Sequence, residues 1–300
     1  MSRCIIFGGT GYIGSMLARG LAESGSFAEI VLADLKPLHG PLPPRTRFVP
    51  CDVRGPIAPH VVAAHAAWIF NFATAHAGPG RTTQESFDTN LYGARNVCAF
   101  AERIGCLNLF FASSTAVYGP TASPAHEDTL KYPATPLGTA KLCAELVHEV
   151  WMKSGPGRRL IVVRPGPIYG PGAGGEMAAM IRALKRGVLF LPGSGELRRS
   201  RGYIHGLLES FEFALARNER LLVYNYVEPV TETTREVAQA IRQFLRAKSV
   251  IVAPPAKLYP FAGAKSEWIE PAKLKQLGFT FRHDLSRSLA HWQSLAPADF

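Results

Sequence analysis

Residues 8–14 read Gly-Gly-Thr-Gly-Tyr-Ile-Gly and directly follow the apolar run Cys4-Ile5-Ile6-Phe7. The glycines at 8, 11 and 14 stand three residues apart, where a predicted strand passes into a predicted helix. Gly8 permits a tight turn, Gly11 lets the backbone approach a pyrophosphate, and Gly14 lets the helix pack close to the sheet. Free N–H groups at the helix start suit phosphate. The stretch therefore predicts a dinucleotide-binding loop, with the cofactor held at Gly8, Gly11, Tyr12, Ile13 and Gly14.

An acidic residue completes this motif. A second predicted strand, residues 29–33, ends at Asp34, twenty residues after Gly14. A carboxylate there accepts hydrogen bonds from both ribose hydroxyls and repels a 2′-phosphate. The sequence therefore predicts NAD in preference to NADP, with Lys36 as a neighbour that weakens the preference. The alternative, a glycine-rich turn that binds nothing, leaves the strand, the helix and the acid unexplained.

Composition is that of a soluble globular protein. The 300 residues are 47% hydrophobic and 19% charged, which suits one large domain or two smaller ones. The five cysteines, at 4, 51, 98, 106 and 143, lack metal-ligand spacing, so we expect reduced thiols and no metal site. The longest apolar run, 61–75, is interrupted by His65 and Asn71 and is too short to span a bilayer. Since the chain enters a strand at once, we expect no signal peptide, a cytoplasmic location and no membrane partner.

The net charge of +10 fits either nucleic acid or an anionic small molecule. Basic residues gather at 182–186 and 198–201, without a helix-turn-helix or zinc signature. A nucleotide-diphosphate substrate explains them better than nucleic acid does, although a solvated basic loop at 198–201 is the alternative.

Strand and helix signals alternate through the first half of the chain. Such alternation predicts an α/β fold, a Rossmann-type doubly wound parallel sheet. We expect an NAD-binding domain over 1–165 that also receives about 221–245, and a smaller C-terminal substrate-binding region over 166–220 and 246–300. Ligands bind at the carboxyl ends of parallel strands. The residues that follow predicted strands, and so converge there, are 8–14, Asp34, Asp52, Ala73, Ser113, Ser114 and Pro165. Predicted helices that bear on the site are 90–103 and 140–152.

Together these motifs resemble the extended branch of the short-chain dehydrogenase/reductases, which are mostly nucleotide-sugar epimerases, dehydratases and reductases. The matching stretches are the glycine loop, Asp52-Val53-Arg54, Asp88-Thr89-Asn90, residues 111–119 and residues 163–172. The resemblance implies that Ser114 binds the reacting hydroxyl and that Lys141 holds the nicotinamide ribose. It also places a homodimer interface on the helices 90–103 and 140–152. Further cofactor contacts implied by it are Asp52, Val53, Phe72, Ala73, Thr74, Asn90, Pro165 and Ile168.

One departure from the family pattern concerns the catalytic pair. The family's Tyr-x-x-x-Lys spacing places Leu137 where the tyrosine stands, four residues before Lys141. The phenol is the family's general acid/base, and leucine has no proton to transfer. Tyr132 is a candidate substitute in a nearby loop. We expect structural roles for Tyr118 and Tyr169, and surface or packing roles for His76, His126 and His205.

The substrate side carries a second departure. The resemblance places Arg201 at the clamp for a nucleotide diphosphate, with Arg199 and Thr115 beside the substrate. Gly202 stands where the family usually has aspartate. Two hypotheses follow. The first is an NAD-dependent enzyme that moves a hydride at a sugar ring carbon, weakened by Leu137. The second is a catalytically impaired NAD-binding protein, either a natural pseudoenzyme or an inactivated variant, with a binding or regulatory role.

Overall fold

The computed structural model describes residues 2–62, 65–75, 82–191, 193–253 and 266–300. The chain forms two compact units. The first comprises the residues up to Gly119, Leu130–Arg164 and Phe211–Tyr224, and the second comprises Pro120–Thr129, Pro165–Ser210 and Asn225–Phe300. The division of labour expected from the sequence, with cofactor binding in 1–165 and 221–245, stays a prediction.

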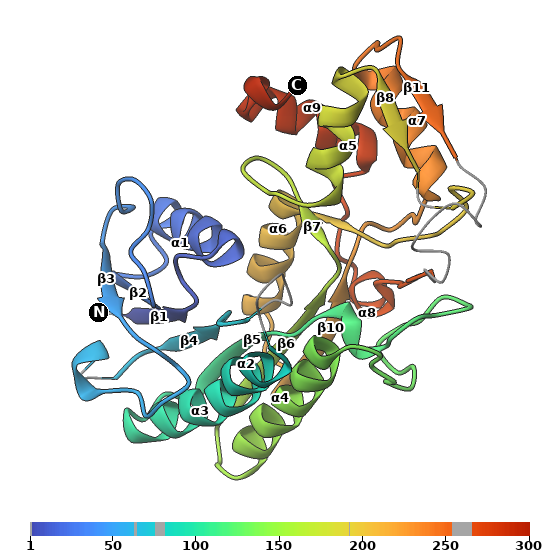
Figure 1. Cartoon of the computed structure of the whole chain (residues 1–300). Helices are drawn as coiled ribbons and strands as arrows, with labels where there is room; N and C mark the ends of the chain where they lie inside the picture. Colours follow the sequence, from blue (N-terminus) through green and yellow to red (C-terminus); the bar gives the residue numbers. More distant parts are fainter. Residues whose placement is uncertain (1, 63–64, 76–81, 192, 254–265) are drawn as a thin grey trace. The chain divides into compact units, whose positions relative to one another are not determined.

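A seven-stranded sheet, in the order β10-β6-β5-β4-β1-β2-β3, organises the first unit (Figure 1). Adjacent strands from β3 to β6 pair in parallel. The order reverses direction at β1, as in doubly wound folds, and this confirms the predicted fold class. The strands are β1 Arg3–Phe7, β2 Glu29–Asp34, β3 Thr46–Pro50, β4 Trp68–Asn71, β5 Asn108–Ala112, β6 Arg159–Pro165 and β10 Leu221–Tyr226.

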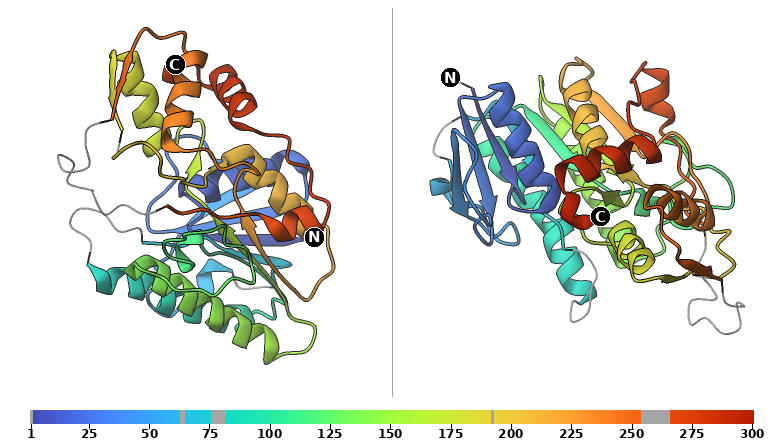
Figure 2. Two further views of the ribbon diagram at one scale, coloured as in Figure 1. Left: turned by 90° about the vertical axis from the view of Figure 1, so that its right-hand side faces the viewer. Right: turned by 90° about the horizontal axis from the view of Figure 1, so that it is seen from above.

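Both faces of this sheet are buried, which is why its strands are nearly continuous apolar runs. On one face Phe7 packs edge-on against Phe100 of α3 (Gly93–Arg103), at 5.8 Å between ring centroids. On the other face Phe110 packs against Phe211 of α6 (Ile204–Leu215), at 4.8 Å. Helices α3 and α4 (Pro136–Lys153) run along the first of these faces, as the left view of Figure 2 shows.

The helical segments predicted at 90–103 and 140–152 both begin earlier in the structure. Thr83–Phe87 (α2) opens with a capping box of Thr82 and Glu85, then passes through a π-helical turn, Asp88–Tyr92, into Gly93–Arg103 (α3). Pro136–Lys153 (α4) starts at a proline, and the Thr135 hydroxyl accepts the N–H of Gly138 at 3.1 Å. Because α4 starts at 136, it includes position 137. The remaining helix with its start in this unit is α1, Tyr12–Ser24.

The second unit contains two small sheets and several helices. β7 (Ile168–Tyr169) pairs with β9 (Gly202–Tyr203), and β8 (Val188–Phe190) pairs with β11 (Val250–Val252). Neither pair was predicted from the sequence. The helices are α5 Glu176–Lys185, α7 Thr234–Phe244, α8 Ala272–Gln276 and α9 Leu285–Leu295, and α6, Ile204–Leu215, begins here and ends in the first unit. Within the described residues, we find no helix with the length and apolarity to cross a bilayer.

Candidate functional site

The glycine loop between β1 and α1 is packed too tightly for side chains. Gly8 has φ of 72°, and a Cβ on it would lie 2.6 Å from the backbone nitrogen of Ala73. A Cβ on Gly14 would collide with the carbonyl oxygen of Gly8. Gly11 is the N-cap of α1, and its N–H donates to that same carbonyl at 3.2 Å. No described side chain caps this helix start, so the loop presents its backbone to a ligand, as a pyrophosphate cradle requires.

Backbone N–H groups hold the carboxylate of Asp34 beside this loop. Its Oδ2 accepts the N–H of Thr10 at 3.1 Å, and its Oδ1 accepts the N–H of Leu35 at 2.7 Å. Each carboxylate oxygen retains a lone pair, and the side chain is half-buried at the end of β2. The carboxylate is therefore oriented and able to accept ribose hydroxyls.

Two further predicted cofactor residues follow β3. The Asp52 carboxylate binds Arg54 through Nη2 at 2.6 Å and Nε at 2.9 Å, and this guanidinium lowers the pKa of Asp52. Val53 is buried against Gly93 at the start of α3, and its carbonyl accepts Nδ2 of Asn96 at 2.8 Å. Helix α3 thus holds the backbone of Val53 in place, whereas Asp52 is exposed and forms its ion pair with Arg54.

The segment after β4 is joined to the π-helical turn. Thr74 Oγ1 donates to Asn90 Oδ1 at 2.9 Å, and Asn90 Nδ2 donates to the Ser86 carbonyl at 2.8 Å. Phe72 is buried among aromatic rings, and the backbone at Phe72 and Ala73 faces Gly8. The structure therefore brings the glycine loop and the predicted contacts at 72–74 and 90 together. π-Helical turns of this kind are frequent at functional sites.

Ser114 and Lys141 are placed by β5 and α4. Ser114 follows the end of β5, and its Oγ accepts the N–H of Ala116 at 3.1 Å. Thr115 beside it is buried. Leu137 and Lys141 lie one turn apart in α4, so a side chain at 137 stands on the same helix face as the lysine. Tyr132, the candidate substitute, precedes α4 with 78% of its side chain exposed.

Lys141 is fully buried. Its Nζ donates to the carbonyl of Ala112 at 2.7 Å and lies 5.0 Å from the ring centroid of Phe111. Burial lowers the pKa of this amine to about 7, while Glu145 acts in the opposite direction. Lys141 therefore sits immediately beneath the strand end that carries Ser114.

A buried ionic network, which the sequence analysis missed, surrounds this lysine. Glu145 accepts two hydrogen bonds from Arg164, from Nε at 2.9 Å and from Nη2 at 2.7 Å, and one from Ser113 Oγ at 2.5 Å. The Nη1 of Arg164 donates to the Tyr118 hydroxyl at 2.7 Å. The carboxylate of Glu145 therefore bonds to Arg164 and Ser113. Its direct ion pair is with Arg164 and not with Lys141.

His148 completes the polar face of α4. Its Nδ1 lies 2.7 Å from the carbonyl of Ala144, and its Nε2 lies 3.3 Å from Nδ2 of Asn71. These partners fit a neutral ring that donates from Nδ1 and accepts at Nε2. Burial lowers the pKa of His148 to about 4, and the nearby Lys141 adds to this. The signal in the sequence was the run of ionisable residues at 141, 145 and 148 on one helix face.

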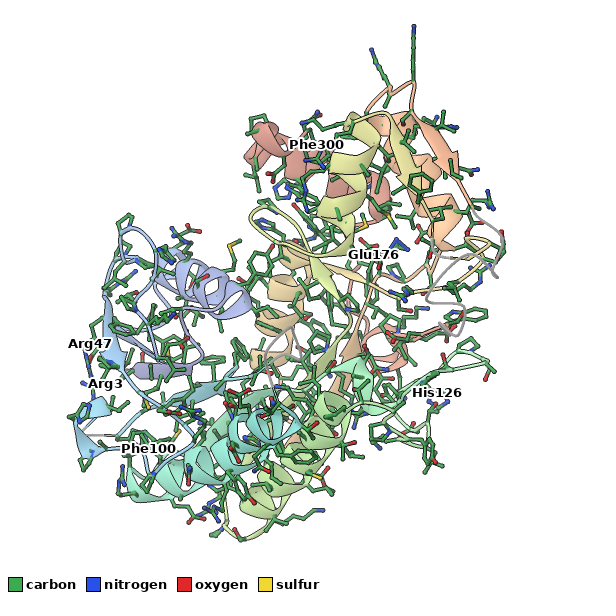
Figure 3. The ribbon with its side chains drawn as sticks, in the orientation of Figure 1. Arg3, Arg47, Phe100, His126, Glu176 and Phe300 are labelled. Carbon is green, nitrogen blue, oxygen red and sulfur yellow. The ribbon has the colours of Figure 1, made fainter. Side chains whose placement is uncertain are left out.

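In the second unit, Arg201 is buried rather than solvated. Its Nη2 pairs with Glu232 at 3.2 Å. It lines a hollow of about 160 Å³ together with Ile168, Tyr169 and Arg199. Arg199 lies 3.5 Å from the carboxylate of Glu176, the residue labelled at the start of α5 in Figure 3. The hollow therefore contains two guanidinium groups beside apolar walls.

A buried carboxyl group lies next to this arginine. Glu228 accepts hydrogen bonds from the hydroxyls of Tyr169 and, at 3.3 Å, of Ser288. Burial raises the pKa of Glu228 to about 7, partly offset by the hydrogen bond from Tyr169 and by the charge of Arg201. Tyr169 is itself buried. Its hydroxyl is therefore occupied by a protein carboxyl group.

The remaining candidates have the following places in the chain. His76 falls outside the described residues, and His126 is exposed. His205 packs against the rings of Tyr203 and His291. Pro165 ends β6. All five cysteines are free, and the described part of the chain contains no group of three His, Cys, Asp or Glu residues arranged for a metal ion.

Comparisons with known proteins identify the family of this chain. Residues 4–227 match the "NAD dependent epimerase/dehydratase family". An undecaprenyl-diphosphate-linked N-acetylglucosamine 4-epimerase of Escherichia coli O157:H7 is 28% identical over 66% of this chain, and the match covers 60% of that protein's length. A UDP-N-acetyl-alpha-D-glucosaminuronate decarboxylase of Bacillus cytotoxicus is 29% identical, over 92% of this chain and 91% of its own.

A solved structure shares the fold over the whole chain. MoeE5 in complex with UDP-glucuronic acid and NAD superposes with a TM-score of 0.85, at 21% identity and full coverage of both chains. At that identity the likeness shows the fold alone. The family match, however, spans about three quarters of the sequence and contains the glycine loop, Asp34, Ser114 and Lys141. The chain belongs to the NAD-dependent epimerase/dehydratase family.

Proposed function

We propose that this protein binds NAD and acts on a nucleotide-diphosphate sugar by hydride transfer at a ring carbon. The observation that carries the proposal is the side-chain-free cradle at Gly8, Gly11 and Gly14, with the carboxylate of Asp34 fixed beside it. The cradle fits a pyrophosphate, and the carboxylate fits an unphosphorylated ribose. When bound, NAD supplies the hydride acceptor and donor that the side chains lack.

The residues at the end of β5 fit the handling of a sugar hydroxyl. Ser114 would bind the reacting hydroxyl, and Lys141 would hold the nicotinamide ribose and tune the acid/base group. A Lys141 pKa of about 7 means that the amine exchanges a proton near neutral pH. This property fits a positioning and tuning role, since the Nζ donates to a backbone carbonyl within the protein.

The substrate class rests on Arg201, Arg199 and the hollow they line. A guanidinium group suits a diphosphate because its N–H donors match phosphate oxygens. The Bacillus relative and the ligand of MoeE5 both carry UDP in their names. UDP-sugars are therefore the first candidate substrates. Activity assays on these sugars distinguish an epimerase reaction from a dehydratase reaction.

Leu137 favours a second candidate function. Ser114 and Lys141 of the family pattern are present, but Leu137 puts an alkyl group where the resemblance places the acid/base phenol. Loss of a general acid/base costs on the order of 10² to 10⁴ in rate. The alternative is therefore an NAD-binding protein of this family with weak or no turnover and a regulatory role.

A cytoplasmic homodimer is part of the proposal. The exposed apolar side chains of Tyr92, Leu146 and Val150 lie on the π-helical turn and α4, where the family resemblance places the dimer contact. An apolar face on paired helices is typical of a subunit interface. Sedimentation velocity on the wild type and Leu146→Glu tests this point, with a monomeric variant as the expected result.

Calorimetry with NAD and NADP tests the cofactor. We expect tighter binding of NAD, because Asp34 repels the 2′-phosphate. Gly14→Ala should abolish binding, since its Cβ would collide with the Gly8 carbonyl. Gly20→Ala, in the same helix with open space around its Cα, is the matched control and should bind as the wild type does. Tighter binding of NADP, or binding of neither cofactor, would contradict the proposal.

A further inference from the structure

One face of the sheet pair β8–β11 carries exposed apolar side chains in the part of the chain that the structure describes. Val188 pairs with Val250 and Phe190 pairs with Val252, so these four side chains share a face of the pair. Phe190 is 62% exposed, Val250 57% and Val188 44%, whereas Leu189 between them is buried. We call the set Val188, Phe190, Val250 and Val252 the outer face. A cluster of exposed large apolar residues in a water-soluble unit marks an interaction surface.

Basic residues gather at one end of the outer face. Both strands enter the pair from the same end, because they are parallel and the N–H of Val250 bonds to the Gly187 carbonyl at 2.9 Å (Figure 1). Arg186 and Lys248 stand two residues before Val188 and Val250, and both are exposed. Lys185 and Arg246, beside them in sequence, are exposed as well. Among the described residues, none of these four cations forms an ion pair with a carboxylate.

The chemistry of this surface identifies its partner. Aliphatic and aromatic side chains next to lysine and arginine suit the boundary between acyl chains and anionic headgroups. Nucleic acid prefers aromatic rings on which bases can stack, and three of the four outer-face residues are valines. A second copy of the chain would bring an equally positive end to this surface. We propose that the outer face docks the protein onto an anionic lipid bilayer.

This docking is peripheral and reversible. One phenylalanine and three valines bury too little area for permanent anchoring, so the basic end must contribute, and salt must weaken binding. The expectation of no membrane partner rested on the lack of a continuous apolar run long enough to span a bilayer. A surface formed by alternate residues of two short strands gives no such run. None of the four outer-face residues lines the hollow at Arg201, so the inference is independent of the proposed catalytic function.

Co-sedimentation with vesicles of phosphatidylglycerol and phosphatidylcholine, compared with pure phosphatidylcholine, tests the docking surface. The wild type should bind the anionic vesicles and lose affinity between 0.05 and 0.5 M salt, roughly as screening dictates. Arg186→Glu with Lys248→Glu should weaken binding about 30-fold or more. Phe190→Ser should weaken it roughly tenfold.

Two controls separate the surface from net charge and from exposure alone. Arg19→Glu with Lys275→Glu changes the net charge equally on exposed residues elsewhere, and Leu130→Ser removes another exposed apolar side chain. Both should bind anionic vesicles as the wild type does. The proposal is overturned if the wild type ignores anionic vesicles, or if the control charge pair weakens binding equally. It is also overturned if Phe190→Ser changes the oligomeric state instead of vesicle binding, because a second copy then covers the outer face.

Discussion

Removing the carboxylate of Glu145 should destabilise the first unit far more than an ordinary charge loss. Glu145, Arg164 and Lys141 are all buried, and Glu145 neutralises Arg164 through two hydrogen bonds of 2.9 and 2.7 Å. In Glu145→Gln, Arg164 and Lys141 would remain buried with no carboxylate beside them. Breaking a buried pair in this way costs about 3–5 kcal/mol. We therefore expect a loss of about that size in the free energy of unfolding.

Urea unfolding at pH 7 measures this loss, and α4 supplies its own control. Glu149 pairs with Lys153 on the exposed side of the helix, at 3.1 Å. Glu149→Gln should cost at most about 1 kcal/mol. The double variant Glu145→Leu with Arg164→Met should recover much of the loss, because it removes both charges together. The reasoning is refuted if Glu145→Gln and Glu149→Gln lower stability equally.

Two further predictions concern pH and the substrate. Burial lowers the pKa of His148 in the folded state to about 4, from an ordinary 6.5. Between these pH values the unfolded chain binds a proton that the folded chain does not, so the free energy of unfolding falls as the pH falls. Urea unfolding at pH 7 and pH 5 should show this decrease, and His148→Phe should make it smaller. UDP should raise the melting temperature of the wild type in a thermal-shift assay, because it binds the folded state. Arg201→Ala should remove most of that increase. An unchanged increase in the variant would exclude Arg201 as the diphosphate clamp.

The sheet and the glycine loop were predictable because their signals are local. Buried parallel strands are short apolar runs, and the loop after β1 has a spacing that few other structures need. The first residues of the helices were predicted less well, because N-terminal capping residues, and not the apolar pattern, determine where a helix begins. Pro136 with Thr135, and the capping box at Thr82, extended α4 and the region before α3 beyond their apolar patterns.

The charged network was not predictable from spacing alone. Glu145 and His148 look like ordinary helix residues until the structure shows Arg164 and Asn71 opposite them. The same holds for the outer face, whose paired residues lie 62 positions apart in the chain, on two strands of three residues each. Helix α6 was not predicted because it is apolar on nearly all sides. Its sequence therefore lacks the alternation of polar and apolar residues that indicates a helix.

The most direct test of the account is the turnover of UDP-sugars by the wild type and by Leu137→Tyr. A phenol at 137 would stand one turn from Lys141, above an amine whose pKa is about 7. We predict weak epimerase and dehydratase activity in the wild type, and an increase on the order of 10² to 10⁴ in the variant on its preferred sugar. Leu130→Tyr, which adds a phenol at an exposed site elsewhere, should change nothing. Wild-type turnover of about 1 s⁻¹ or more would contradict the account, as would a Leu137→Tyr variant that binds NAD but stays inert on every sugar.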